Sequence, residues 1–360
     1  MITTTEELIE LMKRAHKTNA VALDTEFIWE RTFYPNLGLI QLALSDEDCF
    51  IIDPLAVKDL SPLGKLLADP SVVKIFHDAP QDLVILRTAT GHDPKNIFDT
   101  RLAAGFCGYD STLSLATLVE RLLGIKLNKG ATRTDWLKRP LDPKQTKYAL
   151  DDVRYLRAIR ILLLARSLSK TNHWLLEELR LFDDLNTYTG LSDTLRYTKI
   201  KGIGNLDSHS LAILQELAQW REEEAKRKNR PRGHIVKDNV LLAIARNRLQ
   251  DREAIQTAGE ISHKSVSSYG DDLIQCVKRG ESQSTEECPP LLKTAKLTAR
   301  EESTFTALCD FITLKSDVNG IDPALVGNKK ELQAFLTTPN PNARQEKGWR
   351  KKFLHEMKNG

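Results

Sequence analysis

The stretch NAVALDTEFIWERTFYP, residues 19–35, decides the fold because it places two carboxylates in an apolar segment of strand-forming residues. Side chains on a β-strand alternate between its faces, so Asp24 and Glu26 are expected on one face, about 7 Å apart. Like charges at this spacing raise each other's pKa and resist burial unless a cation lies between them. Oxygen ligands suit Mg²⁺ or Mn²⁺. The alternative is that the strand ends here and both acids face water.

Length and composition predict an ordinary globular protein of two or three domains, with 360 residues, 41% hydrophobic and 28% charged. The first residues resemble a threonine-capped amphipathic helix rather than a signal peptide. No run approaches the ~20 apolar residues of a membrane span. A cytoplasmic location is therefore the expectation.

The five cysteines are widely separated and form no Cys-x-x-Cys pair, which argues against a zinc site and against a disulfide framework. The net charge of +3 is too small to indicate a polyanion partner by itself. Basic residues are nevertheless concentrated in two places, with six Lys or Arg in residues 221–232 and six in residues 344–360.

The N-terminal half alternates strand-like and helix-like patterns, which is typical of an α/β domain. Strands are expected at 20–27, 38–44, 49–54 and 72–76, and helices at 80–90, 111–124 and 144–169. Farther along the chain only helical patterns remain. The expected division is an α/β domain at 1–180, a linker at 181–206, a first helical domain at 207–285, a linker at 286–296 and a second helical domain at 297–360.

Capping residues mark the helical domains. Asp207 and Ser208 open one helix, and Asp238 is expected to cap another. In the second module Asn328 is followed by Glu331 three residues later, as in a capping box.

A further acid, Asp82, lies in HDAPQDLVIL, where Pro80 suits the first helical position. The macrodipole alone favours an acid in a first helical turn, so this position has a structural alternative. Asp78 is expected as the cap, and His77 is more readily explained as a packed or capping histidine than as a metal ligand.

The last cluster is KYALDDVRYLRAI, in which Tyr148 and Asp152 are four residues apart and stack on one helical face. A tyrosine beside a carboxylate could hold a water molecule next to a metal ion. The alternative is an amphipathic helix with a tyrosine at the edge of its core.

Taken together, these clusters resemble the DEDD exonucleases of the DnaQ-like fold, in the subgroup with tyrosine. The segments DTEFIWERTFYPNLGLIQLA, FHDAPQDLVIL, IFDTRLAAGF, GATRTDWLKRPL and YALDDVRYL look like ribonuclease D, as does the ending KGWRKKFL. The helical modules resemble the HRDC domains of that family. The resemblance implies an α/β exonuclease domain with a mixed sheet, followed by two all-α HRDC-like domains.

The resemblance also implies a mechanism and its residues. It makes Asp24, Glu26, Asp82 and Asp152 the ligands of two divalent metal ions, Mg²⁺ or Mn²⁺, about 3.5–4 Å apart, and Tyr148 the residue that orients the attacking water. Asp24 would be the bridging ligand. Water attack would release nucleoside 5′-monophosphates from the 3′ end of RNA. Precursor tRNA and other small structured RNAs are the expected substrates. A monomer would suffice, and neither an obligate protein partner nor a membrane is expected.

Substrate contacts are expected, by resemblance, from aromatic and polar or cationic residues near the metal site: Phe27, Tyr34, His77, Lys129, Arg133 and Arg139. The basic residues 227–232 either bind phosphates or form a solvated helix end. Aromatic residues on helices are more often core residues than platforms on which bases stack, so Trp220, Trp349 and Phe353 are expected in the core.

Two competing functions remain open. The acids are shared with DNA-directed proofreading exonucleases, although the chain has no polymerase or helicase motif. A non-catalytic RNA-binding protein with a decayed pocket is the other reading, and the presence of all four acids and the tyrosine argues against it.

Overall fold

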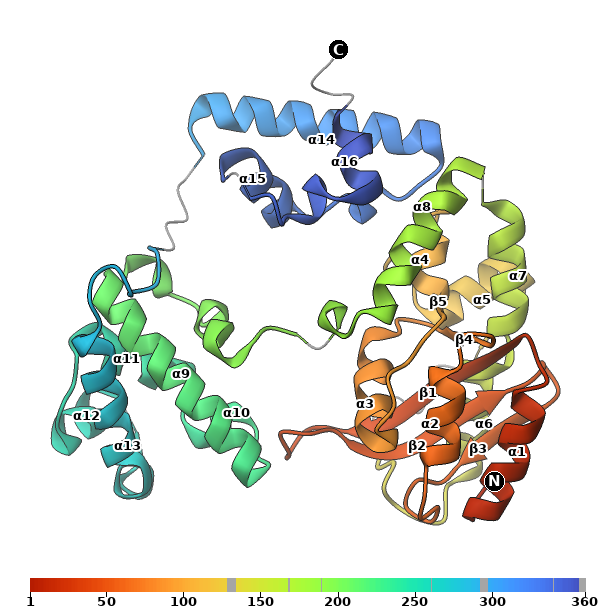
Figure 1. Cartoon of the computed structure of the whole chain (residues 1–360), viewed down its shortest axis with the longest axis horizontal. Coiled ribbons are helices and arrows are strands. Elements are labelled where there is room, and N and C mark those ends of the chain that lie inside the picture. The colour runs from red at the N-terminus through yellow and green to blue at the C-terminus, as the bar shows by residue number, and fades with distance from the viewer. Residues whose placement is uncertain are drawn as a thin grey trace. The chain divides into compact units, whose positions relative to one another are not determined.

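The computed structural model describes residues 1–127, 134–167, 169–188, 190–259, 261–291, 297–338 and 340–355 (Figure 1). They form two compact units. The first combines Met1–Ile28, Leu37–Thr189 and Leu297–Gly360, and the second combines Trp29–Asn36 and Gly190–Lys296. The C-terminal helices therefore belong to the same compact unit as the N-terminal α/β part.

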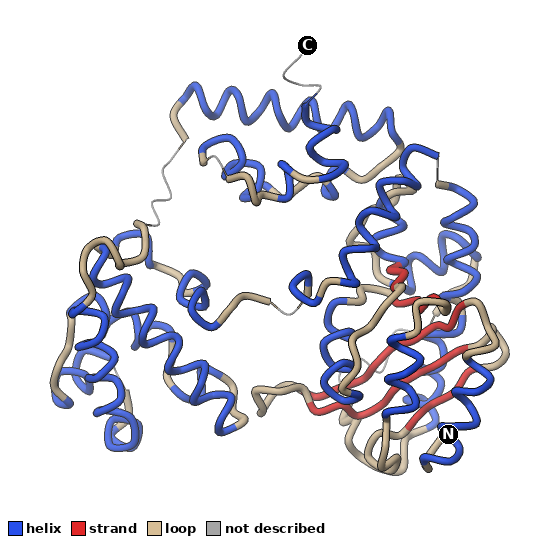
Figure 2. The backbone as a smooth tube through the Cα atoms, viewed as in Figure 1, coloured by secondary structure: helices blue, strands red, loops and turns tan. Residues whose placement is uncertain are grey.

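The first unit is built on a mixed five-stranded sheet with the order β3-β2-β1-β4-β5 (Figure 2). Its strands are β1 (Ala20–Ile28), β2 (Asn36–Ala43), β3 (Cys49–Ile52), β4 (Val73–Phe76) and β5 (Ile97–Asp99). β4 runs parallel to β1 and β5, whereas β2 and β3 are antiparallel. The four expected strands and the mixed sheet are confirmed, and the short β5 is an addition.

Strand register brings the acids together. Ala22 of β1 pairs with Ile75 of β4, and Phe76 of β4 pairs with Asp99 of β5. Because parallel strands end at the same edge of a sheet, Asp24, the turn that follows β4 and Asp99 meet at one edge.

Eight α-helices surround this sheet among the described residues of the N-terminal part. They are α1 (Thr5–Ala15), α2 (Ser61–Ala68), α3 (Pro80–Thr90), α4 (Thr100–Gly105), α5 (Leu115–Leu123), α6 (Pro143–Arg154), α7 (Leu156–Arg166) and α8 (Ser169–Arg180). In Figure 1, α1, α2 and α3 lie on the viewer's side of the sheet and α6 lies behind it. The single helix expected at 144–169 is wrong: Tyr155 separates α6 from α7.

The C-terminal part consists of α14 (Ala299–Asn319), α15 (Lys329–Thr337) and α16 (Gly348–His355), with 3₁₀ turns η5 (Pro323–Leu325) and η6 (Arg344–Glu346). Its Trp349 stacks on Trp174 of α8 with ring centroids 5.1 Å apart, and donates an indole hydrogen bond to Glu178 at 2.9 Å. Arg350 completes a buried ion pair with Glu178. These contacts explain why α14–α16 share one core with the α/β part, and Trp349 and Phe353 are core residues.

The second unit is helical, with α9 (Ser208–Lys228), α10 (Arg232–Ile235), α11 (Asp238–Asn247), α12 (Arg252–Gly259) and α13 (His263–Ser282). Four 3₁₀ turns precede α9: η1 (Leu181–Asp183), η2 (Leu185–Thr187), η3 (Asp193–Lys199) and η4 (Ile203–Asn205). All four lie in the expected linker 181–206. The turns η1 and η2 belong to the first unit, whereas η3 and η4 belong to the second, where Tyr197 and Ile203 are buried in the helical core. The domain boundaries drawn from the sequence remain a prediction, and the linker 286–296 lies partly outside the described residues.

Two of the three caps are confirmed. The side chain of Asp207 caps α9, and Asn328 forms a capping box with Glu331. The expectation for Asp238 is wrong, because Lys237 occupies the cap position and the Asp238 carboxylate instead accepts a hydrogen bond from Arg221 at 2.7 Å.

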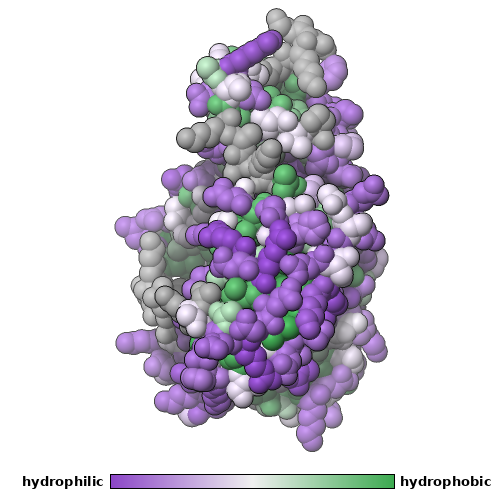
Figure 3. Space-filling model, turned by 90° about the vertical axis from the view of Figure 1, so that its left-hand side faces the viewer, coloured by the Kyte–Doolittle hydropathy of each residue, from purple (hydrophilic) through white to green (hydrophobic). Residues whose placement is uncertain are grey.

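Most of the basic residues at the end of α9 have protein partners. Arg227 and Lys228 pair with Glu224, and Arg232 pairs with the buried Glu222. These contacts favour the structural explanation of the 227–232 cluster. The face shown in Figure 3 is mostly hydrophilic, with smaller hydrophobic areas between the polar side chains. No helix within the described ranges is long and apolar enough to cross a membrane.

Candidate active site

Three carboxylates converge at the edge of the sheet. Asp24 and Glu26 project from β1, Asp152 projects from α6, and one oxygen of each lies within 4.8 Å of the others. They line a pocket of about 490 Å³ together with Asp82 and Tyr148. Oxygen ligands at this separation suit a small divalent cation. The expected pairing of Asp24 with Glu26 on one strand face is confirmed.

Asp82 lines the same pocket but lies outside this three-residue cluster. It stands in the first turn of α3, where Pro80 starts the helix as expected. Its carboxylate is buried and accepts a hydrogen bond from the hydroxyl of Thr25, the residue between the two strand acids. Thr25 therefore connects β1 to α3 at the site.

Burial and mutual repulsion make the acids reluctant to ionise. Burial raises the pKa of Asp24 well above its usual range, and the charges of Asp82, Asp152 and Glu26 add to the rise. Burial, with the charges of Asp152 and Asp82, raises the pKa of Glu26 to about 8. Burial raises the pKa of Asp82 and of Asp152 to about 7. A divalent cation would favour the ionised forms by supplying the opposite charge. The donor set therefore fits metal ions.

Tyr148 stands one turn before Asp152 on α6, which begins at a capping box made by Asp142 and Gln145. Its ring centroid lies 6.1 Å from that of the buried Trp136. Burial and the neighbouring carboxylates raise the pKa of Tyr148, with Asp152 contributing most among the charges. The hydroxyl therefore stays neutral and is able to donate one hydrogen bond and accept others.

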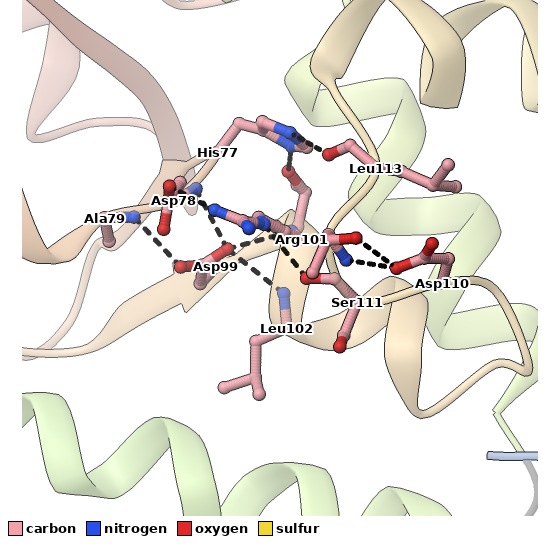
Figure 4. A network of polar contacts seen from close by, with 11 residues as sticks. His77, Asp78, Ala79, Asp99, Arg101, Leu102, Asp110, Ser111 and Leu113 are labelled. Carbon is pink, nitrogen blue, oxygen red and sulfur yellow. Dashed lines mark hydrogen bonds and ion pairs between the residues drawn. The ribbon is translucent and has the colours of Figure 1, made fainter. Parts of the chain in front are cut away.

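The turn after β4 is held by a polar network (Figure 4). The buried carboxylate of Asp99 accepts hydrogen bonds from the backbone N–H groups of Asp78 at 3.2 Å and Ala79 at 2.9 Å. Asp78 has the left-handed backbone φ of 69° and forms an ion pair with Arg101. The expectation that Asp78 caps α3 is therefore wrong: Ala79 occupies the cap position, without a side-chain cap.

His77 is packed, as expected. Its ring nitrogens contact the Thr100 hydroxyl at 2.9 Å and the Leu113 carbonyl at 3.0 Å. Burial lowers the pKa of His77. His77 and Phe27 both line the acidic pocket, which keeps open their expected role in substrate binding.

Two other expected substrate contacts, Tyr34 and Arg139, do not line this pocket. Tyr34 is exposed and belongs to the second unit. Lys129 and Arg133 lie outside the described residues. Arg139 makes two 2.7 Å hydrogen bonds to the carboxylate of Asp53 and another to the Gly38 carbonyl, so its guanidinium holds the protein together.

The sequence interpretation missed two contributors. Thr25 lies between the two strand acids, and this position in the sequence could have indicated a role at the site. Asp99 ends a short apolar run, as Asp24 does, but the run is too brief to mark a strand. Neither residue shows its hydrogen-bond partner in the sequence, because those partners lie far along the chain.

Known proteins match both parts of the chain. A family model described as 3′-5′ exonuclease matches residues 1–166, and one described as HRDC domain matches residues 210–277. The chain is 50% identical to ribonuclease D of Desulfotalea psychrophila, over 99% of this chain and 96% of that protein. It is 31% identical to ribonuclease D of Escherichia coli over 99% and 96%.

A solved structure agrees. The crystal structure of Escherichia coli RNase D, described as an exoribonuclease involved in structured RNA processing, matches with a TM-score of 0.88 at 30% identity, over 99% of this chain and 96% of that one. The DnaQ-like exonuclease domain and the HRDC domain after it are thereby confirmed, while the HRDC character of residues 297–360 stays a prediction. The chain belongs to the ribonuclease D family of 3′-5′ exoribonucleases.

Proposed function

We propose that this chain shortens RNA from its 3′ end at the pocket of Asp24, Glu26, Asp82 and Asp152, with Tyr148 orienting the attacking water and two divalent ions, Mg²⁺ or Mn²⁺, held by the acids. The convergence of three carboxylates within 4.8 Å, beside Tyr148, carries the proposal. The products would be nucleoside 5′-monophosphates.

Each residue has a task that follows from its environment. Asp24, Glu26 and Asp152 bind cations because their oxygens converge, and Asp82 approaches from α3 under the control of Thr25. The neutral hydroxyl of Tyr148 holds the water by a hydrogen bond, and Asp152 lies one turn away on the same face. Bound divalent ions would supply electrostatic stabilisation of the phosphodiester and activation of water.

The substrate class is RNA, as for the family. We propose trimming of precursor tRNA and other small structured RNAs by a cytoplasmic monomer. The description of the Escherichia coli relative as acting in structured RNA processing supports the substrate, and the presence of every proposed site residue in one chain supports the monomer.

A digestion experiment tests the function. A 3′-extended tRNA and a single-stranded DNA of matched sequence are incubated with Mg²⁺, Mn²⁺ or EDTA, and products are identified by mass. We expect stepwise, metal-dependent shortening of the RNA with release of 5′-monophosphates. Equal shortening of the DNA would favour a DNA-directed enzyme, and no shortening of either would favour a binding protein.

Neighbouring acids on α6 provide a matched pair of variants. Asp152→Asn removes a carboxylate of the cluster and should abolish hydrolysis. Asp151→Asn removes one that instead lies 3.3 Å from Lys147 and 3.6 Å from Arg154, so it should retain activity. Equal loss in both variants would point to damage of the helix instead of the site.

A further inference from the structure

A second cavity adjoins the acidic pocket inside the first unit. It has a volume of about 740 Å³ and shares two lining residues, Asp78 and Pro80, with the pocket of the acids. This size falls in the range of ~300–1,000 Å³ typical of ligand sites. A chain that ends in the acidic pocket can therefore continue into this cavity around the turn that begins α3.

One wall of the cavity comes from the network of Figure 4. There the Asp99 carboxylate is fully occupied by backbone N–H groups, including those of Arg101 at 2.8 Å and Leu102 at 3.2 Å. Arg101 also pairs with Asp78 and donates to the Ser111 carbonyl at 2.9 Å. These charges are neutralised by the protein and form a fixed wall.

The C-terminal part also contributes lining residues, and its two cations have weaker contacts with protein carboxylates than Arg101 has. Arg344 is 53% exposed, and its nearest carboxylates, Glu178 and Glu331, lie at 3.7 and 3.9 Å. Glu178 is already committed to Arg350 through a 2.9 Å hydrogen bond. Lys347 is exposed, and its ammonium has no hydrogen-bond or ion-pair partner in the described part of the chain.

The remaining acid of the lining, Asp184, forms no ion pair with either cation among the described residues. Asp184 is exposed and accepts hydrogen bonds from the backbone and side chain of Asn186 at 3.0 and 2.9 Å. Burial and the positive charge of Arg350 lower the pKa of Arg344, whereas the carboxylates of Glu178 and Glu331 raise it. Arg344 and Lys347 both line the cavity, so an anion placed between them would be attracted by two positive charges.

We propose that this cavity binds the RNA strand upstream of the scissile bond, with Arg344 and Lys347 against its phosphates. The inference rests on the proposed function, since the acidic pocket must hold the 3′ end. It assigns a substrate contact to the C-terminal part of the chain. It also predicts that RNA long enough to reach beyond the acidic pocket binds more tightly, because its upstream phosphates contact Arg344 and Lys347.

The test compares substrates of two lengths. A dinucleotide without terminal phosphates contains only the scissile phosphate, whereas a single-stranded octanucleotide has phosphates upstream of it. KM and kcat are measured for both substrates at several salt concentrations, with wild type, Lys347→Ala, the double variant Arg344→Ala/Lys347→Ala, and the control Lys351→Ala. Lys351 is exposed on the neighbouring helix α16 but does not line the cavity.

For the octanucleotide we expect Lys347→Ala to raise KM about three- to fivefold, the scale of one exposed ion pair. The slope of log KM against log salt should fall by about 0.7 for each phosphate that the protein no longer neutralises. The double variant should show a larger change in both quantities. All variants should hydrolyse the dinucleotide as wild type does, and Lys351→Ala should match wild type on both substrates.

Equal behaviour of Lys347→Ala and Lys351→Ala on the octanucleotide would overturn the inference, as would an equal rise of KM on the dinucleotide. Failure of the proposed function gives a separate result, because wild type would then hydrolyse neither substrate. Since the Lys347 ammonium has no partner among the described residues, its variant should fold, and its melting temperature verifies this.

Discussion

The carboxylate of Asp99, buried at the end of β5, accepts a hydrogen bond from the backbone N–H of Ala79 at 2.9 Å. This contact joins the ends of two parallel strands and sets the start of α3. Asp82 stands in the first turn of that helix. The position of Asp82 in the acidic pocket therefore depends on Asp99, which does not line that pocket.

Replacing Asp99 should cost both stability and activity. Asp99→Asn presents an amide group to backbone donors and leaves some of them unsatisfied, so we expect the free energy of unfolding to fall by about 2 kcal/mol. Urea denaturation measures this loss. Asp110→Asn is the control, because the Asp110 side chain is exposed and its carboxylate accepts hydrogen bonds only from Thr112 among the described residues. A loss no larger than in the control would contradict the role assigned to Asp99.

Thr25 should matter for turnover more than for RNA affinity. Thr25→Val keeps the side-chain shape and removes the donor to Asp82. We expect kcat to fall about tenfold, or about 1.4 kcal/mol in activation free energy, with KM for RNA nearly unchanged. Thr25→Ser restores the hydroxyl and should recover most of kcat. If serine and valine were equally impaired, the hydroxyl would not be the important group.

The acid cluster should destabilise the metal-free protein. Asp24 is surrounded by Asp82, Asp152 and Glu26, whose charges oppose its ionisation. Asp24→Asn in EDTA at pH 8 should therefore raise the free energy of unfolding by about 2 kcal/mol while abolishing hydrolysis. Asp151→Asn removes only the pairs with Lys147 and Arg154 and should change stability by less than about 1 kcal/mol. A destabilised Asp24→Asn protein would show that repulsion at the site is not significant.

The burial of Lys74 predicts that the free energy of unfolding rises at alkaline pH. It is fully buried on β4, where its ammonium donates to the carbonyls of Asp69 at 2.6 Å and Val72 at 2.8 Å. Burial lowers the pKa of Lys74 to about 8. Between pH 8 and about 10.5 the unfolded chain binds more protons at this residue than the folded chain, so stability rises with pH, by about 3 kcal/mol at most.

Lys74→Met should remove that rise, and Lys65→Met should keep it because Lys65 is exposed on α2. Unfolding free energies measured by urea denaturation between pH 7.5 and 10.5 test this. Parallel curves for wild type and Lys74→Met would mean that burial does not disfavour the charged form of this lysine.

Sequence patterns predicted the four longer strands, because each is an apolar run bounded by polar or turn residues. They also placed Asp24, Glu26, Tyr148 and Asp152, since strand and helix periodicity fix which side chains share a face. β5 was missed because its three residues, Ile97–Asp99, are too few to show periodicity. The break at Tyr155 has no glycine or proline to mark it, and it arises where α6 ends and α7 packs against β1 and β4.

Local sequence patterns could not predict side-chain contacts between residues that lie far apart in the chain. Asp78 was expected to cap α3 because it precedes that helix, but its carboxylate forms an ion pair with Arg101. Arg139 looked like a phosphate contact, but Asp53 and Gly38 bind it. In both cases the competing partner lies elsewhere in the chain, so only the assembled fold reveals it.

The central claim is that the acidic pocket is the metal centre of the exoribonuclease. Its most direct measurement is Mn²⁺ binding by electron paramagnetic resonance, performed together with RNA digestion, on wild type and Asp24→Asn. We expect wild type to bind two Mn²⁺ ions per chain in the presence of a non-hydrolysable RNA, and Asp24→Asn to lose both binding and shortening of RNA. Full Mn²⁺ binding, or full hydrolysis, by Asp24→Asn would contradict the account.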